Sequence, residues 1–445
     1  MAESIWSREV RIPERKPLRG DLKTDTVVIG AGMAGILTAY HLQRQGLRVV
    51  VLEAERIGSG QTKNTTAKIT SQHGLVYTDL VQKIGKKKAG LYAKANEAAV
   101  TAYERLVREH EIACGFERLS SYLYARDGRE RLEKEAQTAA ELGIHASFVE
   151  TVPLPFPTAG AVCFENQAQF HPLEFIRRIS EELTIYEKTR VLSVHGHHIQ
   201  TDAGNVRAEH IVFATHYPFL NLPGFYFMRQ HQERSYVLAL SGAEHYPGMY
   251  YSADAGGLSF RNAGEYLLLG GGTHRTGANV CGGAYEKLMV QAERFYPGCK
   301  ERTRWSAQDC MPHDNLPFIG PYSLFRPYWY VASGFKKWGM TSSMIAAQVI
   351  TDQICGKKNP YAEVFHPGRL LLRASLPALV KDLGISAREL VSGVFHPKKR
   401  CPHMGCCLVW NPDEESYDCP CHGSRFDRHG KLIDNPAQSG MKNAE

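Results

Sequence analysis

Two short motifs near the end of the chain each pair a cysteine with a histidine. The first is Cys401-Pro402-His403 and the second is Cys419-Pro420-Cys421-His422. Zinc ribbons use two Cys-x-x-Cys pairs, and zinc fingers join one such pair to two spaced histidines, so neither template fits. Mixed pairs suit a cluster of two irons and two sulfides, with two thiolates on one iron and two imidazoles on the other. We therefore predict Cys401, His403, Cys419 and His422 as metal ligands, with a zinc or purely structural site as the alternative.

These motifs and their surroundings resemble the Rieske iron–sulfur domain. The resemblance implies a disulfide between Cys406 and Cys421, while two buried thiols are the alternative in a reducing compartment. Gly405 and Gly423 would let the backbone pass close to a 2Fe-2S cluster, and donors such as Ser424 would tune its potential. The strands that usually precede the first cluster loop are missing. We expect a truncated base that leans on the preceding domain.

A dinucleotide-binding fingerprint lies near the start of the chain. An apolar stretch leads into Gly30-Ala31-Gly32-Met33-Ala34-Gly35, a helical pattern follows, and a second apolar stretch ends at Glu53. A strand, a glycine turn, a helix and an acid at this spacing are typical of nucleotide binding. The three glycines would make the turn, admit the pyrophosphate and pack helix on strand, and Glu53 would bind the ribose. A glycine-rich turn without a nucleotide is the alternative.

Only one such fingerprint is present, which disfavours a second nucleotide domain for NAD(P)H. Over about residues 21–358 the chain resembles the D-amino-acid oxidase-like family of FAD enzymes, which includes glycine and sarcosine oxidases. The resemblance implies an α/β FAD-binding domain (Rossmann-like, of the glutathione-reductase type) with an inserted α+β substrate domain. It implies FAD contacts from Gly30, Gly32, Met33, Ala34, Gly35, Glu53, Ala54, Gln61, Thr62, Thr66, Ala67, Lys68, Val191, Ala214, Thr215, Gly339, Met340 and Thr341.

Fewer features of the sequence point to the residues that bind substrate. Glycine oxidases carry an arginine just before the last FAD segment, and this chain has Asp309 there. An acid weakens an α-amino-acid assignment and could attract a cationic amine. Cys310 is a candidate for a covalent flavin link, with a free buried thiol as the alternative. The other catalytic candidates are Lys68, which could instead cap a loop, and three residues in the strand region that the family uses for substrate, with a surface or structural role as the alternative, namely Arg261, His274 and Arg275.

The pattern along the chain predicts three units. The oxidoreductase domain is 21–358, with FAD-binding parts at about 21–80, 160–220 and 310–358, and substrate parts at about 81–159 and 221–309. Amphipathic helices are expected within 81–150 and strands within 221–309. A connector follows at 359–396 and ends in a helical pattern over 376–394. The all-β Rieske domain is 397–445.

Composition and charge disfavour membrane-spanning, secreted and nucleic-acid-binding proteins. Hydrophobic residues make up 43% and charged residues 22% of the chain, and the net charge is +7. No apolar run reaches membrane-spanning length and no signal-peptide core is present, so we expect a cytoplasmic location with most of the 11 cysteines as thiols or ligands. The basic runs at 86–88 and 398–400 lack a nucleic-acid motif. The second run is a candidate docking site for an acidic one-electron acceptor protein.

These features predict a flavin oxidoreductase fused to its own electron carrier. A small-molecule substrate with a CH–NH bond would reduce FAD, and electrons would pass singly to the Rieske cluster, with the reverse direction left open. The alternative is an FAD oxidase that uses oxygen, in which the cluster is structural or senses redox state. A Rieske oxygenase would need a mononuclear iron domain after the cluster, where 23 residues follow His422.

Overall fold

The computed structural model describes residues 3–369, 371–396 and 399–441. The predicted cluster domain, 397–445, therefore includes residues 397, 398 and 442–445 that lie outside the described ranges. No described helix is long and apolar enough to cross a membrane.

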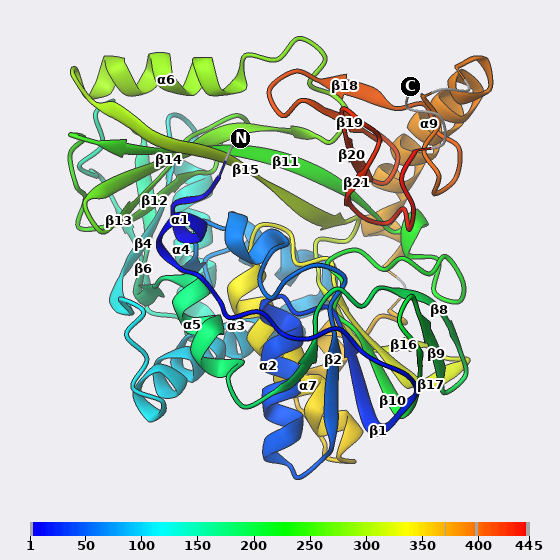
Figure 1. The fold of residues 1–445 in the computed structure, drawn as a ribbon. Coiled ribbons are helices and arrows are strands. Elements are labelled where there is room, and N and C mark those ends of the chain that lie inside the picture. Colours follow the sequence, from blue (N-terminus) through cyan, green and yellow to red (C-terminus); the bar gives the residue numbers. More distant parts are fainter. Residues whose placement is uncertain (1–2, 370, 397–398, 442–445) are drawn as a thin grey trace.

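The first sheet, in the lower half of Figure 1, is mostly parallel. Its strands are β1 (Leu22–Ile29), β2 (Val49–Leu52), β7 (Thr184–Tyr186), β8 (Val191–His195), β9 (His198–Thr201), β10 (Asn205–Phe213), β16 (Phe318–Ser323) and β17 (Arg326–Ser333). The order is β16-β17-β10-β1-β2-β7, and β1 pairs in parallel with β2 and β10. Helices α2 (Met33–Arg44) and α7 (Gly339–Ile354) pack against it. Val27 and Val28 are both fully buried, as expected for a parallel strand covered on both faces.

A nine-stranded mixed sheet lies above the first. Its strands are β3 (Lys68–Ile69), β4 (Glu117–Ala125), β5 (Ala146–Val149), β6 (Gly160–Gln169), β11 (Gln230–Ser241), β12 (Gly248–Ser252), β13 (Ser259–Ala263), β14 (Tyr266–Arg275) and β15 (Lys300–Pro312). Segment 160–169, grouped by sequence with the FAD-binding parts, forms β6 and pairs with β4 in this sheet. The sheet carries α4 (Arg129–Glu141) and α6 (Ala284–Phe295). Helix α3 (Val76–Glu109) packs on α4 and α7 and is kinked at Gly85.

The third unit is small and antiparallel. Strands β18 (Val409–Asn411), β19 (Ser416–Asp418), β20 (Arg425–Asp427) and β21 (Leu432–Asp434) pair in sequence order. The connector forms α9 (Leu372–Phe395), slightly longer than the predicted helix. The Cys407 N–H donates to Glu389 O of α9 (2.9 Å), so the helix and the cluster unit are packed together. In Figure 1 this unit lies beside the ends of β11 and β15.

The remaining described elements are short: α1 (Ile5–Glu9), α5 (Pro172–Ile179), α8 (Ala362–Phe365), and the 3-10 turns η1 (Gln61–Asn64) and η2 (Tyr226–Met228). The predicted fold class is confirmed: an α/β nucleotide-binding domain, an α+β layer inserted into it, and a small all-β unit.

Candidate functional site

The glycine turn between β1 and α2 contains three glycines with different roles. Gly30 and Gly35 leave no space for a Cβ within the protein, whereas Gly32 does. Gly30 has φ +104°, and a Cβ there would lie 2.6 Å from Ala214 O. A Cβ at Gly35 would lie 1.9 Å from Gly30 O. At Gly32 a Cβ would meet only Thr62 Oγ1, at 3.3 Å. The missing side chain of Gly32 therefore leaves room for a group that is not part of the protein.

The N-terminus of α2 borders this open side. The first turn of α2 has no side-chain cap from its N-cap residue, Gly32, and the Met33 N–H donates to Thr62 Oγ1 (2.9 Å). A helix N-terminus favours an anionic group such as a pyrophosphate. Glu53 accepts hydrogen bonds from the N–H groups of Ala31 (2.7 Å) and Glu55 (2.8 Å), so its carboxylate is fixed beside the turn.

Most of the other predicted cofactor residues gather around the same turn. The Ala214 N–H donates to Ile29 O (2.9 Å), which sets Ala214 and Thr215 beside Gly30. Gly339, Met340 and Thr341 open α7, which packs on α2. Val191 is buried with Leu52 and Phe213 on the other side of the sheet. Ala54 follows Glu53, and Gln61, Thr62, Thr66 and Ala67 lie in or just after η1.

Lys68 and Arg261, two of the catalytic candidates, both donate hydrogen bonds to neighbouring protein groups. Lys68 Nζ donates to Ser259 Oγ (2.7 Å) and Thr66 Oγ1 (3.3 Å), and burial together with the charge of Arg261 lowers the pKa of Lys68 to about 7. Arg261 donates to Gln169 Oε1 and to Phe170 O, both at 2.8 Å, and to Thr66 O. Because all of its nitrogens bind protein acceptors, Arg261 has a structural role here.

The face of β11 and β15 that looks toward the first sheet carries an acidic pair. Glu233 lies opposite Asp309 in the β11–β15 register, and Val237 and Trp305 of the same face belong to the core that contains α2 and α7. Lys337 Nζ lies 3.2 Å from Asp309 Oδ2, and burial raises the pKa of Asp309. Cys310 points to the opposite face, because strand side chains alternate, and its thiol donates to His216 O (3.4 Å).

The two predicted cluster loops have the same local construction. The Gly405 N–H donates to Cys401 O (2.8 Å), and the Gly423 N–H donates to Cys419 O (2.9 Å). Both glycines adopt positive φ, +88° and +83°, which turns each loop back on its cysteine. Cys401, Cys406, Cys419 and Cys421 lie in one buried cluster, which brings the two loops together.

The histidines of these loops fit a metal cluster. Nδ1 of His403 and Nδ1 of His422 are both buried and have no hydrogen-bond partner. The two rings are 4.9 Å apart at 89°. His403 Nε2 donates to Asn221 Oδ1 (2.7 Å), which leaves the Nδ1 lone pair free as a ligand. Burial lowers the pKa of His403 to about 4, so the ring is neutral at neutral pH.

The predicted disulfide between Cys406 and Cys421 is not supported. Both cysteines are free in the structure. Their sulfur atoms and that of Cys419 lie within 4.8 Å of one another, and all three cysteines are buried.

His274 and Arg275, predicted as catalytic candidates, lie at the boundary with the cluster unit. Arg275 donates to Pro420 O (2.8 Å), to Cys421 O (3.1 Å) and to the carboxylate of Asp382 on α9. His274 bonds Tyr236 Oη (3.0 Å) and Arg275 O (2.7 Å). Arg275 therefore fastens the second cluster loop to the end of β14.

Three amide side chains that the sequence did not single out complete this boundary. Gln232 Nε2 donates to His422 O (2.8 Å), and Gln308 Nε2 donates to Gly423 O (2.8 Å). Asn435 Nδ2 donates to Thr215 O (2.8 Å) and Tyr217 O (2.7 Å). Asn435 thus joins the cluster unit to the segment beside the glycine turn. Gln61, a predicted cofactor residue, also reaches Asp434 Oδ1 (3.3 Å).

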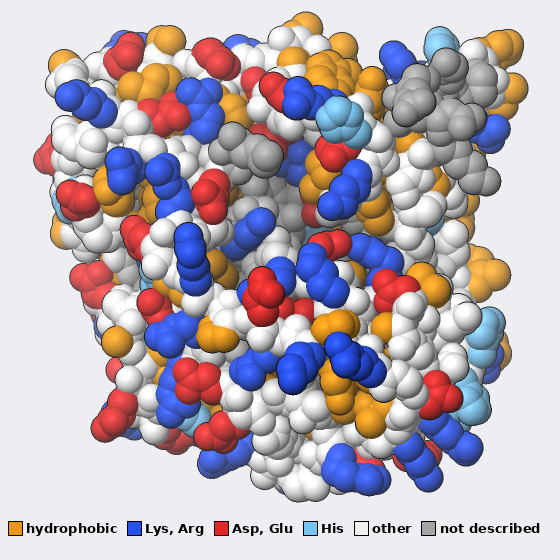
Figure 2. Space-filling view, viewed as in Figure 1, with side chains coloured by type: hydrophobic (Ala, Val, Ile, Leu, Met, Phe, Trp, Pro, Cys, Tyr) orange, Lys and Arg blue, Asp and Glu red, His pale blue; other side chains and the backbone are white. Residues whose placement is uncertain are grey.

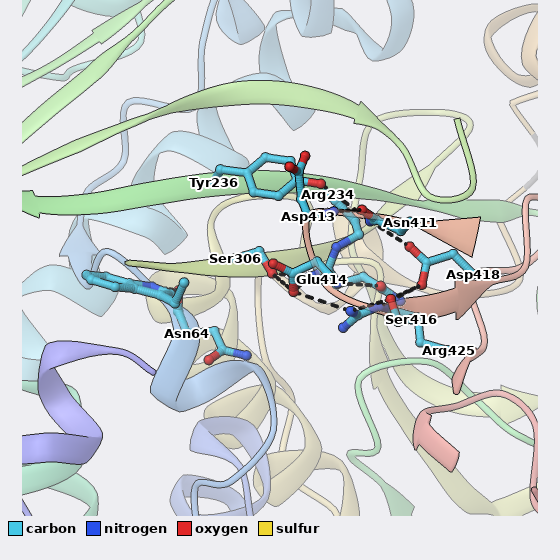
Figure 3. Close-up of polar contacts among 12 residues, drawn as sticks. Asn64, Arg234, Tyr236, Ser306, Asn411, Asp413, Glu414, Ser416, Asp418 and Arg425 are labelled. Carbon is cyan, nitrogen blue, oxygen red and sulfur yellow. Dashed lines mark hydrogen bonds and ion pairs between the residues drawn. The ribbon is translucent and has the colours of Figure 1, made fainter. Parts of the chain in front are cut away.

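A buried ionic network supports the same boundary (Figure 3). Glu414 of the cluster unit lies between Arg234 of β11 (2.8 Å) and Arg425 of β20 (3.3 Å). Its carboxylate also accepts from Tyr285 (2.7 Å) and Ser306 (2.5 Å). Burial alone would raise the pKa of Glu414, but the two guanidinium groups hold it below its ordinary value. Such a set of charges is stable only while every partner is present.

Comparisons with known proteins agree with this division of the chain. Residues 25–353 match the family model of FAD dependent oxidoreductases, and residues 392–445 match that of the Rieske [2Fe-2S] domain. YhfW of Bacillus subtilis, named as a Rieske 2Fe-2S iron-sulfur protein, is 32% identical over 99% of this chain and 97% of its own length. The cytochrome b6-f complex iron-sulfur subunit 2 of Trichormus variabilis is 45% identical over 18% of this chain and 51% of its own.

A solved structure supports the fold of the larger part. Glycine oxidase from Geobacillus kaustophilus has a TM-score of 0.66 at 18% identity, and the match covers 78% of this chain and 99% of that enzyme. At this level of identity the likeness shows a common fold.

Proposed function

Because the chain belongs to the FAD dependent oxidoreductase family and carries a Rieske [2Fe-2S] domain, we propose that it passes electrons between FAD and the Rieske cluster within one molecule. FAD exchanges electrons in pairs with a substrate, whereas the cluster exchanges them singly. The proposed direction is from substrate to FAD to cluster and then to a one-electron acceptor protein. The proposed location is cytoplasmic.

The proposal assigns a role to each predicted residue set. The cluster ligands are Cys401, His403, Cys419 and His422. The FAD contacts are those predicted around the glycine turn, η1, Val191, Ala214, Thr215 and the start of α7. The domain division is 21–358 for the oxidoreductase, 359–396 for the connector and 397–445 for the cluster domain.

One observation carries the proposal: the cluster domain shares direct contacts with segments assigned to FAD. Asn435 bonds the carbonyls of Thr215 and Tyr217, and Gln61 reaches Asp434. His403, a proposed ligand, bonds Asn221 of the oxidoreductase domain. These contacts support transfer within one chain, without a diffusing domain.

The substrate class that we propose is an amine with an oxidisable CH–NH bond. The face of β11 and β15 over the first sheet presents Glu233 and Asp309, and the resemblance to glycine oxidases implies an arginine at the position of Asp309. Lys337 Nζ lies 3.2 Å from Asp309 and 4.0 Å from Glu233, and His231 Nε2 lies 3.7 Å from Glu233. An acid in the place of that arginine supports a cationic amine over a substrate recognised through its carboxylate.

The His403→Ala variant tests this function. The variant is expected to lose iron and acid-labile sulfide. It should keep FAD, because the contacts of His403 lie outside the glycine turn. Flavin bleaching by an active amine, found in an anaerobic screen, should continue, while cytochrome c reduction falls by about tenfold or more. His429→Ala changes an exposed histidine of the same domain and should behave as wild type.

The oxidase alternative makes the opposite prediction. If His403→Ala and wild type both form hydrogen peroxide stoichiometrically from oxygen and reduce cytochrome c equally, the cluster does not carry the electrons. Stoichiometric zinc without acid-labile sulfide in anaerobically purified protein would also contradict the proposal.

A further inference from the structure

Helix α9 exposes a band of large apolar side chains. Leu376, Val380, Leu383, Leu390, Val391, Val394 and Phe395 are between 36% and 75% exposed. Figure 2 shows hydrophobic side chains at the upper right, the region where Figure 1 places α9. Single exposed apolar residues are common on protein surfaces, but a contiguous set on one helix marks an interaction surface.

The band occupies one side of the helix because the other side is fixed to the protein. At about 100° per residue, the exposed apolar positions span an arc of about 140°. On the opposite side, Asp382 accepts from His313 (2.8 Å), His231 (3.1 Å) and Arg275. Glu389 is buried, and its carbonyl accepts from the Cys407 N–H. The apolar side therefore points outward as a consequence of how the helix is anchored.

The charges around the band are of one sign. The exposed charged side chains described between residues 375 and 400 are all basic, namely Lys381, Arg388, Lys399 and Arg400, while the acids Asp382 and Glu389 face inward. Arg388 keeps 77% of its side chain exposed although it contacts Glu389. A second copy of this helix would offer no exposed acid to these cations.

The apolar surface also extends beyond α9. The helix packs on η2, where Met228 is 38% exposed, and the preceding Phe225 is 50% exposed. Exposed apolar side chains thus lie on α9 and on the segment that it packs against, with Lys381 and Arg388 along one edge of the band. A wide apolar face with exposed Lys and Arg is the pattern of a helix that lies in the plane of a membrane surface.

We propose that α9 docks this protein on an anionic phospholipid surface, with the apolar band inserted at the headgroup level and the basic side chains against lipid phosphates. The inference goes beyond the proposed electron transfer and does not depend on it. Because α9 packs on the first cluster loop, docking would hold the Rieske domain close to the membrane surface.

The test uses the full-length holoprotein and vesicles of phosphatidylcholine with or without phosphatidylglycerol. Wild type is expected to sediment with the anionic vesicles, and added salt should weaken binding. Val394→Gln should reduce the partition coefficient by about tenfold, the equivalent of one valine no longer buried. Lys381→Gln should also lower it. Val290→Gln, on α6, is the matched control because Val290 is 66% and Val394 65% exposed.

FAD and iron content confirm that each variant is folded. Failure of wild type to bind anionic vesicles, equal binding to neutral vesicles, or unchanged binding by Val394→Gln would overturn the proposal. A wild-type dimer that Val394→Gln converts to a monomer in sedimentation velocity would overturn it as well, by showing that a second copy covers the band.

Discussion

The Gly32→Val variant is expected to fold but to purify with little or no FAD. A Cβ at this position meets only Thr62 Oγ1 within the protein, at 3.3 Å, and no backbone atom, so we expect the apoprotein to accommodate the substitution. The same side chain would project into the space beside the α2 N-terminus, where a pyrophosphate binds. FAD content by absorbance, together with circular dichroism of the apoprotein, measures both parts of the expectation.

Gly35→Ala is the contrasting variant. Its Cβ would lie 1.9 Å from Gly30 O, so it should disturb the packing of α2 on β1 and lower stability as well as FAD content. If Gly32→Val retained FAD at wild-type affinity, the pyrophosphate would not lie at this turn.

The Glu414→Gln variant is expected to lower the free energy of unfolding of the cluster domain by about 3–5 kcal/mol. Glutamine keeps the shape of the side chain but leaves Arg234 and Arg425 facing each other without the intervening charge. Urea unfolding, followed anaerobically through the visible absorbance of the cluster, measures the loss. Glu415→Gln is the control, since Glu415 is 71% exposed and pairs with Arg428 only at 3.9 Å.

The loss of stability in Glu414→Gln should decrease as the pH falls. The pKa of Glu414 lies below its ordinary value of 4.5 in the folded protein. A depressed folded-state pKa contributes stability that is fully present above pH 4.5 and is lost as the pH falls through the folded-state value. Wild type and Glu414→Gln should therefore differ most near neutral pH and converge in acid. A difference that persists undiminished in acid would exclude the carboxylate charge as its cause.

Sequence alone predicts those parts of the site that are local in the chain. The roles of Gly30 and Gly35 follow from a motif of six residues, and their geometry agrees with the structure. The loops that carry His403 and His422 also follow from spacing. In each case the residues that interact are a few positions apart, so a short pattern contains the whole constraint.

The boundary between the domains could not be predicted in this way. Gln232, Gln308 and Asn435 are ordinary polar residues in sequence, and their partners lie 115 or more positions away. Arg275 was one of the catalytic candidates, with a surface or structural role as the alternative. It lies where β14 ends against the cluster loop, and its donors go to Pro420 and Cys421. The predicted disulfide is not supported, because the likeness to the Rieske domain does not determine whether Cys406 and Cys421 are oxidised.

The most direct test of the account is the rate of transfer between the two centres. The flavin of the oxidised holoprotein is reduced anaerobically by a short light pulse with EDTA as electron donor, and the cluster is followed by its Rieske electron paramagnetic resonance signal after freezing. The account predicts that the signal appears in a first-order process whose rate is unchanged by protein concentration. A rate that rises in proportion to protein concentration, or a cluster that stays oxidised beside reduced flavin despite a higher measured potential, would contradict it.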